Sequence, residues 1–229
     1  MKILALESSA KAASVCLTED GKLVSQYFQN SGLTHSKTLL KMAEDMLNSL
    51  GLTVKDVDLV ACAHGPGSFT GIRIGVAAAK GLAWGADLKL CGVSTLEAMA
   101  YGFADRESEI ICPVMDARRG QIYNGLFTVE NGSIKRLSPD RAISIAQLIE
   151  EMKQEGKTPL LVGDGAMLCA EAFAGADVPY KLPSPQLMFQ NAYGVAAAAE
   201  NHEPQDDITP NYLRLSQAER ERLARGEKI

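Results

Sequence analysis

The sequence has few of the residues that build metal sites and disulfide frameworks. It contains three histidines and five cysteines in 229 residues, and none of them form the closely spaced pairs that zinc sites require. Most of the cysteines lie in or beside apolar runs, where a thiol behaves as a small hydrophobic group. The absence of a disulfide pattern is typical of a reducing compartment, so the sequence predicts a cytoplasmic protein without a metal site of its own.

Long hydrophobic runs are also absent. No apolar stretch approaches the roughly 20 residues of a membrane-spanning helix, and residues 1–7 read as a strand rather than as a signal peptide. We therefore expect a soluble intracellular protein that makes no contact with a membrane.

Acidic residues outnumber basic residues in the sequence. Lysine and arginine total 23 against 28 aspartates and glutamates, which gives a net charge of −5 and a pI near 5.3. Binding of nucleic acid by the chain alone needs clustered basic residues, and the pair Arg118-Arg119 is too small to supply them. The composition therefore argues against unaided nucleic-acid binding.

The motifs of common enzyme classes are missing as well. The sequence has neither the Gly-x-Ser-x-Gly motif of serine hydrolases nor a phosphate-loop Lys-Ser/Thr pair. Glu7 and Asp116, at the ends of predicted strands, would suit a metal-dependent nuclease of ribonuclease-H-like fold. The alternative is that Glu7 caps a turn and Asp116 holds a loop.

The most informative stretch is the glycine-rich run at residues 65–75, between an apolar run and an alanine-rich run. This order predicts a strand, a tight turn and a helix with Ser68 as its N-cap. Gly71, Gly75 and Ala79 recur at every fourth residue, which leaves one helix face without side chains. Because Gly71 and Gly75 lie beyond the free amides of the first turn, we expect this face to pack closely against another element rather than to bind phosphate.

Hydrophobic periodicity predicts an α/β protein of two lobes. The first lobe has the order β-β-β-α-β-α-β, and the second begins with a hairpin at residues 110–129 and continues with helices and a strand. We expect the first lobe to span residues 1–106 and the second residues 107–207, with residues 208–229 returning to the first. The elements expected after the hairpin are a helix at 144–154, a strand at 158–162, a helix after 163–165 and a helix at 189–200.

Five motifs together resemble the bacterial TsaB (YeaZ) family, and the resemblance runs over nearly the whole chain. They are residues 3–9 (ILALESS), 65–75, 92–96 (GVSTL), 116–118 (DAR) and the Pro-x-Tyr-Leu-Arg motif at 210–214. The resemblance implies the ASKHA fold of actin and sugar kinases, which pairs two ribonuclease-H-like lobes. It also implies a small subunit that works with TsaD, TsaE and ATP to transfer threonylcarbamoyl to the adenosine beside the anticodon of ANN-decoding tRNAs.

Comparison with the catalytic paralogue TsaD implies that the functional positions have changed. Thr95 and Met99 stand where TsaD-like proteins carry two metal-binding histidines, and neither is a credible ligand. The paired glycines of the paralogue's phosphate loop are replaced here, and its first-turn acids fall near Lys11. The altered nucleotide and metal positions are Ser9, Lys11, Thr95, Met99, Asp116, Ala117 and Arg118.

A non-catalytic subunit must act through a contact surface, and the glycine ridge is the predicted one. With the apolar stripe of the helix at 34–50, it is expected to form a helical bundle with TsaD, and to self-pair when TsaD is absent. On this hypothesis Gly75→Leu abolishes pairing without unfolding the chain. The alternative is that the ridge packs only against its own sheet, in which case the variant unfolds. The predicted interface residues are Leu39, Met42, Ala43, Met46, Gly71, Ile74, Gly75, Ala78, Ala79 and Leu82.

The remaining expectations concern ligands and rival functions. The chain alone is expected to bind no cofactor, with ATP or ADP and a metal held in TsaD or at a composite interface. The tRNA is expected to contact mainly the partner. Rival hypotheses are a stand-alone ATP-binding enzyme of the same fold, a peptidase, and the nuclease that would use Glu7 and Asp116.

Overall fold

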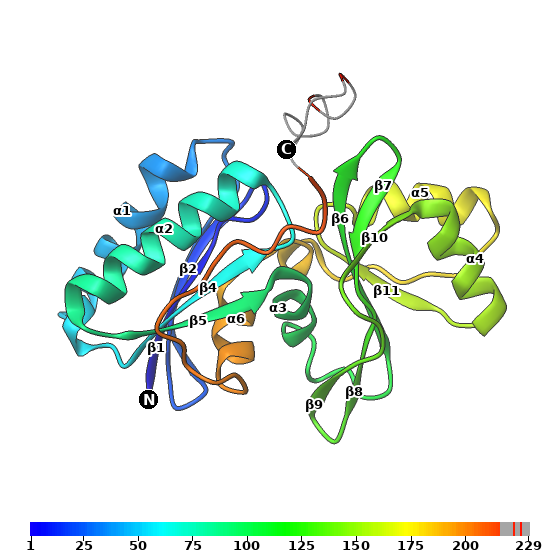
Figure 1. The fold of residues 1–229 in the computed structure, drawn as a ribbon. Coiled ribbons are helices and arrows are strands. Elements are labelled where there is room, and N and C mark those ends of the chain that lie inside the picture. The colour runs from blue at the N-terminus through cyan, green and yellow to red at the C-terminus, as the bar shows by residue number, and fades with distance from the viewer. Residues whose placement is uncertain (216–221, 223–224, 226–229) are drawn as a thin grey trace.

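The first lobe is built on a five-stranded sheet of order β3-β2-β1-β4-β5. A computed structural model describes residues 1–215, 222 and 225, and it places this lobe beside a second α/β lobe (Figure 1). The strands β1, β4 and β5 run parallel, while β2 and β3 form an antiparallel meander beside β1, as the sequence predicts. The elements are β1 (Lys2–Glu7), β2 (Ala13–Glu19), β3 (Lys22–Gln29), α1 (His35–Ser49), β4 (Leu59–Gly65), α2 (Phe69–Ala86) and β5 (Lys89–Ser94), with a short 3-10 helix, η1 (Val54–Asp56).

The second lobe is built around β6 (Ile110–Arg118). Its sheet has the order β10-β7-β6-β8-β9, and β11 pairs in parallel with β6. The single strand expected at residues 121–129 is two strands, because β7 pairs with the end of β6 and β8 with its start. The elements are β7 (Gln121–Asn124), β8 (Phe127–Glu130), β9 (Ser133–Arg136), β10 (Arg141–Ser144), α4 (Ile145–Glu155), β11 (Pro159–Val162), α5 (Ala166–Gly175) and the 3-10 helix η2 (Pro185–Leu187).

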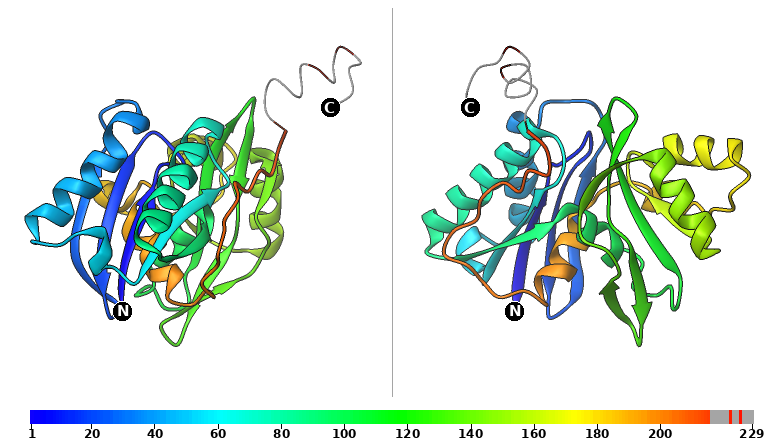
Figure 2. Two further views of the ribbon diagram at one scale, coloured as in Figure 1. Left: turned by 60° about the vertical axis from the view of Figure 1, so that its left-hand side comes forward. Right: turned by 45° about the vertical axis from the view of Figure 1, so that its right-hand side comes forward.

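Helices cover both faces of the first sheet. α1 and α2 lie on one face (Figure 2). There Leu39, Met46 and Ile72 are fully buried with the apolar side chains of β1, β2 and β4. The other face is covered by α6 (Ala192–Ala199), which also packs against α3 (Thr95–Tyr101). The expectation that residues up to 207 belong to the second lobe is therefore wrong for α6, whose alanine-rich surface is narrow enough to fit between α3 and the sheet.

Close packing of α2 against β1 explains the glycines at its start. Ser68 caps the helix, since its hydroxyl accepts a hydrogen bond from the amide of Gly71 at 3.3 Å. A Cβ added at Gly71 would overlap the carbonyl oxygen of Ser8, and one added at Gly75 would lie 2.5 Å from Ser8 Oγ and 3.2 Å from Cys62 Sγ. The ridge thus brings the helix onto the end of β1, and it fixes the turn that follows that strand.

The end of the described chain returns to the first lobe. Gln205 bridges to Leu90 on β5, Ile208 is buried in the first core, and the amide of Asn211 donates to His64 O at 2.7 Å. Residues 216–221, 223–224 and 226–229 of the predicted returning segment lie outside the described residues. None of the helices that the structure describes combines the length and apolar character needed to cross a bilayer.

Candidate functional site

A hollow of about 470 Å³ lies between the two lobes. Its walls come from the turn after β1, the start of α2, the end of β6 and the loop after β11, so it lies where the carboxyl ends of the central parallel strands meet. Five of the seven positions expected to be altered gather here. The lining residues among them are Ser9, Lys11, Asp116, Ala117 and Arg118, joined by Gly67, Tyr123, Asp164 and Arg214.

Glu7 lies beneath this hollow and does not line it. The residue is fully buried at the end of β1, where one carboxylate oxygen accepts the amide of Ser9 at 2.6 Å and the other has no hydrogen-bond partner. Burial raises the pKa of Glu7 to about 7, and the nearby Asp164 adds to the rise while the bonds from Ser9 oppose it. Because Glu7 is buried and only Asp116 lines the hollow, the two carboxylates do not form the open pair that the nuclease hypothesis needs.

Asp164, unlike Glu7, lines the hollow, as Asp116 does. Its Oδ1 accepts a hydrogen bond from the buried Gln190 at 2.9 Å, and burial raises the pKa of Asp164, with a further contribution from Asp116. Asp116 itself accepts the amide of Arg118 at 2.7 Å and pairs with the same residue's guanidinium at 3.1 Å. Asp116 therefore organises the hairpin tip, as the alternative reading of this residue expected.

Thr95 and Met99, the other two altered positions, lie away from the hollow on α3. Both are buried, Met99 in the core that α3 shares with the second lobe, and Thr95 with its hydroxyl unpaired. Within the described ranges, no group of three or more His, Cys, Asp or Glu side chains is arranged to hold a metal ion. The expectation that the chain alone binds no metal stays a prediction.

The predicted partner interface is largely internal. Leu39, Ala43, Met46, Gly71, Gly75 and Ala79 are buried in the core of the first lobe, because these faces of α1 and α2 pack on the sheet. The prediction that these six residues form a contact surface is therefore wrong, and the alternative that the ridge packs on its own sheet is correct. Met42, Ile74, Ala78 and Leu82 are partly buried at the edge of that core.

The exposed side of α2 carries a second row of small residues. Ala77, Gly81 and Gly85 are exposed at four-residue spacing, and a Cβ added at either glycine would meet nothing within 4 Å. Beside them Trp84, the chain's single tryptophan, is 90% exposed. Next to this row lies a largely apolar groove of about 490 Å³. It is lined by six apolar residues, Leu40, Ala43, Leu47, Leu52, Val54 and Leu82, and by four polar residues of α1 and the loop that follows it, Lys41, Glu44, Asn48 and Thr53.

The tail at residues 208–215 connects the lobes across the mouth of the hollow. Tyr212 stacks on Phe69 with ring centroids 4.5 Å apart, and Arg73 donates to the Tyr212 hydroxyl at 2.7 Å while lying over both rings. Two residues later Arg214 donates to the carbonyl of Ala117 at 2.7 Å, on the second lobe. The tail is thus anchored on both lobes.

Removing the Tyr212 ring should loosen this anchor. We expect Tyr212→Ala to lower the free energy of unfolding by about 1–2 kcal/mol, since it loses both the aromatic pair and the cation–π contact. Tyr212→Phe keeps the stacked ring and loses only the hydroxyl, so its loss should be less than half as large. Thermal unfolding of the two variants checks this, and equal losses would mean that the stack contributes nothing.

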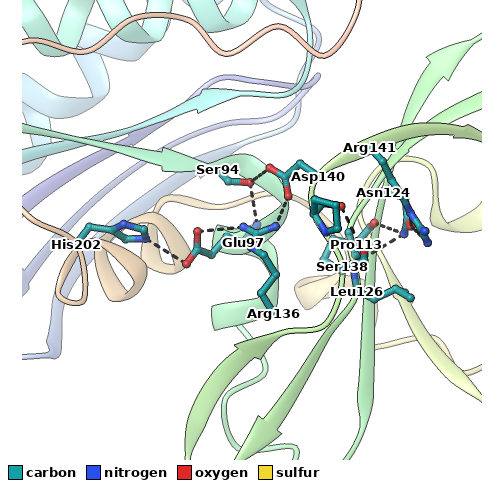
Figure 3. A network of polar contacts seen from close by, with 12 residues as sticks. Ser94, Glu97, Pro113, Asn124, Leu126, Arg136, Ser138, Asp140, Arg141 and His202 are labelled. Carbon is teal, nitrogen blue, oxygen red and sulfur yellow. Dashed lines mark hydrogen bonds and ion pairs between the residues drawn. The ribbon is translucent and has the colours of Figure 1, made fainter.

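A polar network ties the lobes together on α3 (Figure 3). Glu97 lies 3.1 Å from His202 Nε2 and accepts Arg136 Nη2 at 3.2 Å, so one carboxylate connects α3, the end of α6 and strand β9. Arg136 also pairs with Asp140, which accepts the hydroxyl of Ser94. These contacts and the tail fix the angle between the lobes and so the shape of the hollow.

Several residues of the hollow were not identified from the sequence. Asp164 was taken as part of a turn, and Arg214 only as part of a family motif. Tyr123 had no signal beyond its place in a strand. The useful signal for Asp164 was its position directly after a buried parallel strand, where polar side chains collect at the edge of an α/β sheet.

Three comparisons with known proteins agree with this geometry. A sequence profile of the family described as TsaD, tRNA N6-adenosine threonylcarbamoyltransferase, matches residues 29–220. The chain is 30% identical over 228 residues to the tRNA threonylcarbamoyladenosine biosynthesis protein TsaB of Bacillus subtilis (strain 168), covering 96% of each chain. It is 35% identical over 156 residues to the protein of the same name from Escherichia coli (strain K12), covering 68% of this chain and 67% of that protein.

Solved structures share the fold. A Pseudomonas aeruginosa crystal structure, described as an uncharacterized protein with similarity to peptidase YEAZ, superposes with a TM-score of 0.78 at 23% identity, covering 93% of this chain and 99% of that one. Component A of the (R)-2-hydroxyglutaryl-CoA dehydratase of Acidaminococcus fermentans superposes with a TM-score of 0.51 at 12% identity, covering 88% and 98%. The fold is that of the ASKHA class, as the resemblance to the TsaB family implies.

Proposed function

The chain belongs to the TsaB family of tRNA threonylcarbamoyladenosine biosynthesis proteins, and from this premise we propose that it is a non-catalytic subunit that binds TsaD. In this role it supports TsaD during transfer of threonylcarbamoyl to tRNA, with TsaE and ATP completing the complex. Nucleotide and metal are held in TsaD or at the interface between the two chains.

The observation that supports this role is the exposed face of α1 and α2. Trp84 is 90% exposed, Leu40 is 49% exposed, and the adjoining groove is largely apolar. Large exposed apolar side chains and a largely apolar groove, which Leu40 lines, are typical of a protein-binding surface. This face is turned away from the sheet, so a partner can cover it without disturbing the core.

The small residues of α2 suit a helical partner. Ala77, Gly81 and Gly85 leave a shallow track along the helix, which lets a second helix approach closely while Trp84 packs beside it. The proposed contact is therefore a helical bundle, as expected from the sequence, but on the outward row of α2 instead of the row at Gly71 and Gly75. The same face pairs two copies of the chain when TsaD is absent.

The hollow supports a non-catalytic role. Thr95 and Met99 are buried, Glu7 does not reach the hollow, and Asp116 is held in an ion pair with Arg118. Of the acids, only Asp164 lines it with no ion pair among the residues that the structure describes. One such carboxylate is a poor basis for the metal-assisted chemistry of the rival enzymes.

Light scattering on a size-exclusion column, with this chain and the TsaD of the same cell, tests the proposal. The wild-type chain should form a one-to-one pair with TsaD. Gly81→Leu and Trp84→Ala should each weaken the pair about tenfold or more, because one fills the track and the other removes the exposed anchor. Both should also reduce self-association of the isolated chain.

Gly175→Leu is the matched control, because Gly175 ends α5 on the second lobe and also has no neighbour within 4 Å of an added Cβ. None of the three variants should melt below the wild type, and Gly81→Leu should melt slightly higher because leucine is a better helix former than glycine. The control should bind TsaD normally. Normal pairing by Gly81→Leu and Trp84→Ala would place the TsaD contact on another face.

A further inference from the structure

Basic side chains gather at the mouth of the hollow, although the chain as a whole is acidic. Lys11, Arg118 and Arg214 line the hollow, Arg119 is next to Arg118 at the hairpin tip, and Arg73 lies over Phe69 and Tyr212 at the opposite edge. We call these five residues the cationic rim. We propose that the cationic rim binds the phosphate backbone of an RNA, and this rests on the proposed function, in which the substrate of the complex is a tRNA.

The backbone of the β6–β7 hairpin shows that its arginines occupy unfavourable positions. Arg118, Arg119 and Gly120 have φ values of 67°, 57° and 71°, so both arginines are in the left-handed region. This conformation costs a residue other than glycine about 1–2 kcal/mol. Two-residue hairpin turns of this shape favour Asn-Gly. Among the described residues, Arg119 takes part in no hydrogen bond or ion pair, and the guanidinium of Arg118 makes one exposed ion pair with Asp116, of a kind that adds little stability. The two side chains therefore offset little of this cost, which indicates that they are needed for a contact with a ligand.

The rim keeps positive charge available to a ligand. Among the described residues Lys11 and Arg119 are exposed and take part in no ion pair, and the Arg214 guanidinium donates to a neutral carbonyl, that of Ala117. Arg118 shares its charge with Asp116. Among the described residues that line the hollow, the one other acid is Asp164, and burial raises the pKa of its carboxyl. The positive charges of the rim that are not paired with an acid belong to arginine and lysine side chains, which bind phosphate oxygens through charge-assisted hydrogen bonds.

The extent of the rim favours a polymer over a single nucleotide. The hairpin tip projects beyond the sheet, on the same side of the molecule as the start of α2 and the end of the described tail (Figure 1). Arg119 and Arg73 are not among the residues that line the hollow, so a nucleotide seated there would make no use of them. A run of backbone phosphates can contact the tip and the hollow at the same time.

The sequence-based argument against nucleic-acid binding used the net charge of −5 and the small size of the Arg118-Arg119 pair. It did not foresee that the fold brings Lys11 and Arg214 to the hollow that Arg118 lines, with Arg73 beside Phe69 and Tyr212 at the opposite edge. Local charge, and not net charge, determines whether phosphates are attracted.

The test measures binding of the complex with TsaD to a fluorescent, unmodified tRNA transcript over a series of salt concentrations. The double variant Arg118→Asn/Arg119→Asn places the favoured turn residue at both left-handed positions. We expect it to bind tRNA about tenfold more weakly at ~0.1 M salt, with the slope of log K against log salt reduced by about 1–2. Its melting temperature should stay level or rise by a few degrees, since the backbone strain is relieved.

The double variant Arg106→Asn/Lys153→Asn is the charge-matched control, because it also removes two exposed positive charges, from residues that do not line the hollow. It should leave both the affinity and the slope unchanged. Light scattering on the same samples shows whether TsaD is bound, so the two proposals can fail separately. If the wild-type chain does not pair with TsaD, the proposed function is wrong, and the titration is read on the isolated chain.

Two results would contradict the proposal that the cationic rim binds RNA. The first is wild-type tRNA affinity and slope in the double variant while TsaD remains bound. The second is loss of ATP binding, measured by calorimetry on the complex, with tRNA binding unchanged, which would identify the rim as a nucleotide site instead.

Discussion

Replacing Gly71 by alanine should lower the free energy of unfolding by roughly 3 kcal/mol. Alanine is ordinarily the better helix former by about 1 kcal/mol, so the expected sign is the reverse of the usual one. The new methyl group would overlap the carbonyl oxygen of Ser8, which belongs to the backbone and cannot rotate away. α2 must then move off β1, and the packing of Ile72 and Ala79 in the first core is lost with it.

Gly81→Ala supplies the matched comparison within the same helix. An added Cβ there meets nothing within 4 Å, so only the helix propensity changes and stability should rise by up to about 1 kcal/mol. In a chain of this size that is a melting temperature about 2–4 °C higher, whereas Gly71→Ala should melt at least 6 °C lower. If both substitutions raised the melting temperature, the ridge would not be tightly packed on the sheet.

Glu7→Gln should remove much of the fall in stability that accompanies rising pH. The pKa of Glu7 is raised by burial from 4.5 to about 7 in the folded chain. Between pH 4.5 and 7 the folded state therefore holds a proton that the unfolded state has lost, so stability declines as pH rises. Over the full shift this amounts to about 3 kcal/mol, present below pH 4.5 and lost above pH 7.

Urea unfolding at pH 4.5 and pH 8 measures this difference. The glutamine keeps an acceptor for the amide of Ser9 and carries no charge. The free energy of unfolding of the wild type should therefore fall by about 3 kcal/mol more than that of the variant when the pH rises from 4.5 to 8. Asp164→Asn is the comparison, since Asp164 contributes to the shift without causing most of it. A pH dependence in Glu7→Gln as steep as the wild type's would mean that Glu7 is already ionised in the folded chain.

The elements of the first lobe could be predicted from local signals. The Asp-Gly turn at residues 20–21, the N-cap Ser68 and the run of small residues after it are all short-range patterns, and each appears where expected. Strand β10 was missed because its four residues carry no alternation that distinguishes them from the cap of α4.

The partner face could not be predicted because α2 carries two rows of small residues. Gly71, Gly75 and Ala79 have the same four-residue spacing as Ala77, Gly81 and Gly85. Spacing shows that a row exists, but only the packing of α2 on β1 determines which row is inside. The cationic rim escaped prediction for a related reason, since its residues lie on four segments that only the fold brings together.

The position of α6 has a consequence for synthesis of the chain. The face of the first sheet that carries Ile3, Ala5 and Ala61 is covered by residues 192–199. When all strands of the first sheet have emerged from the ribosome, one apolar face of that sheet is therefore still exposed. The first lobe cannot finish folding until the second lobe and α6 have emerged as well. Ordinarily an N-terminal domain folds first as a unit. Here the two lobes must mature together, and a fragment cut between them is expected to aggregate.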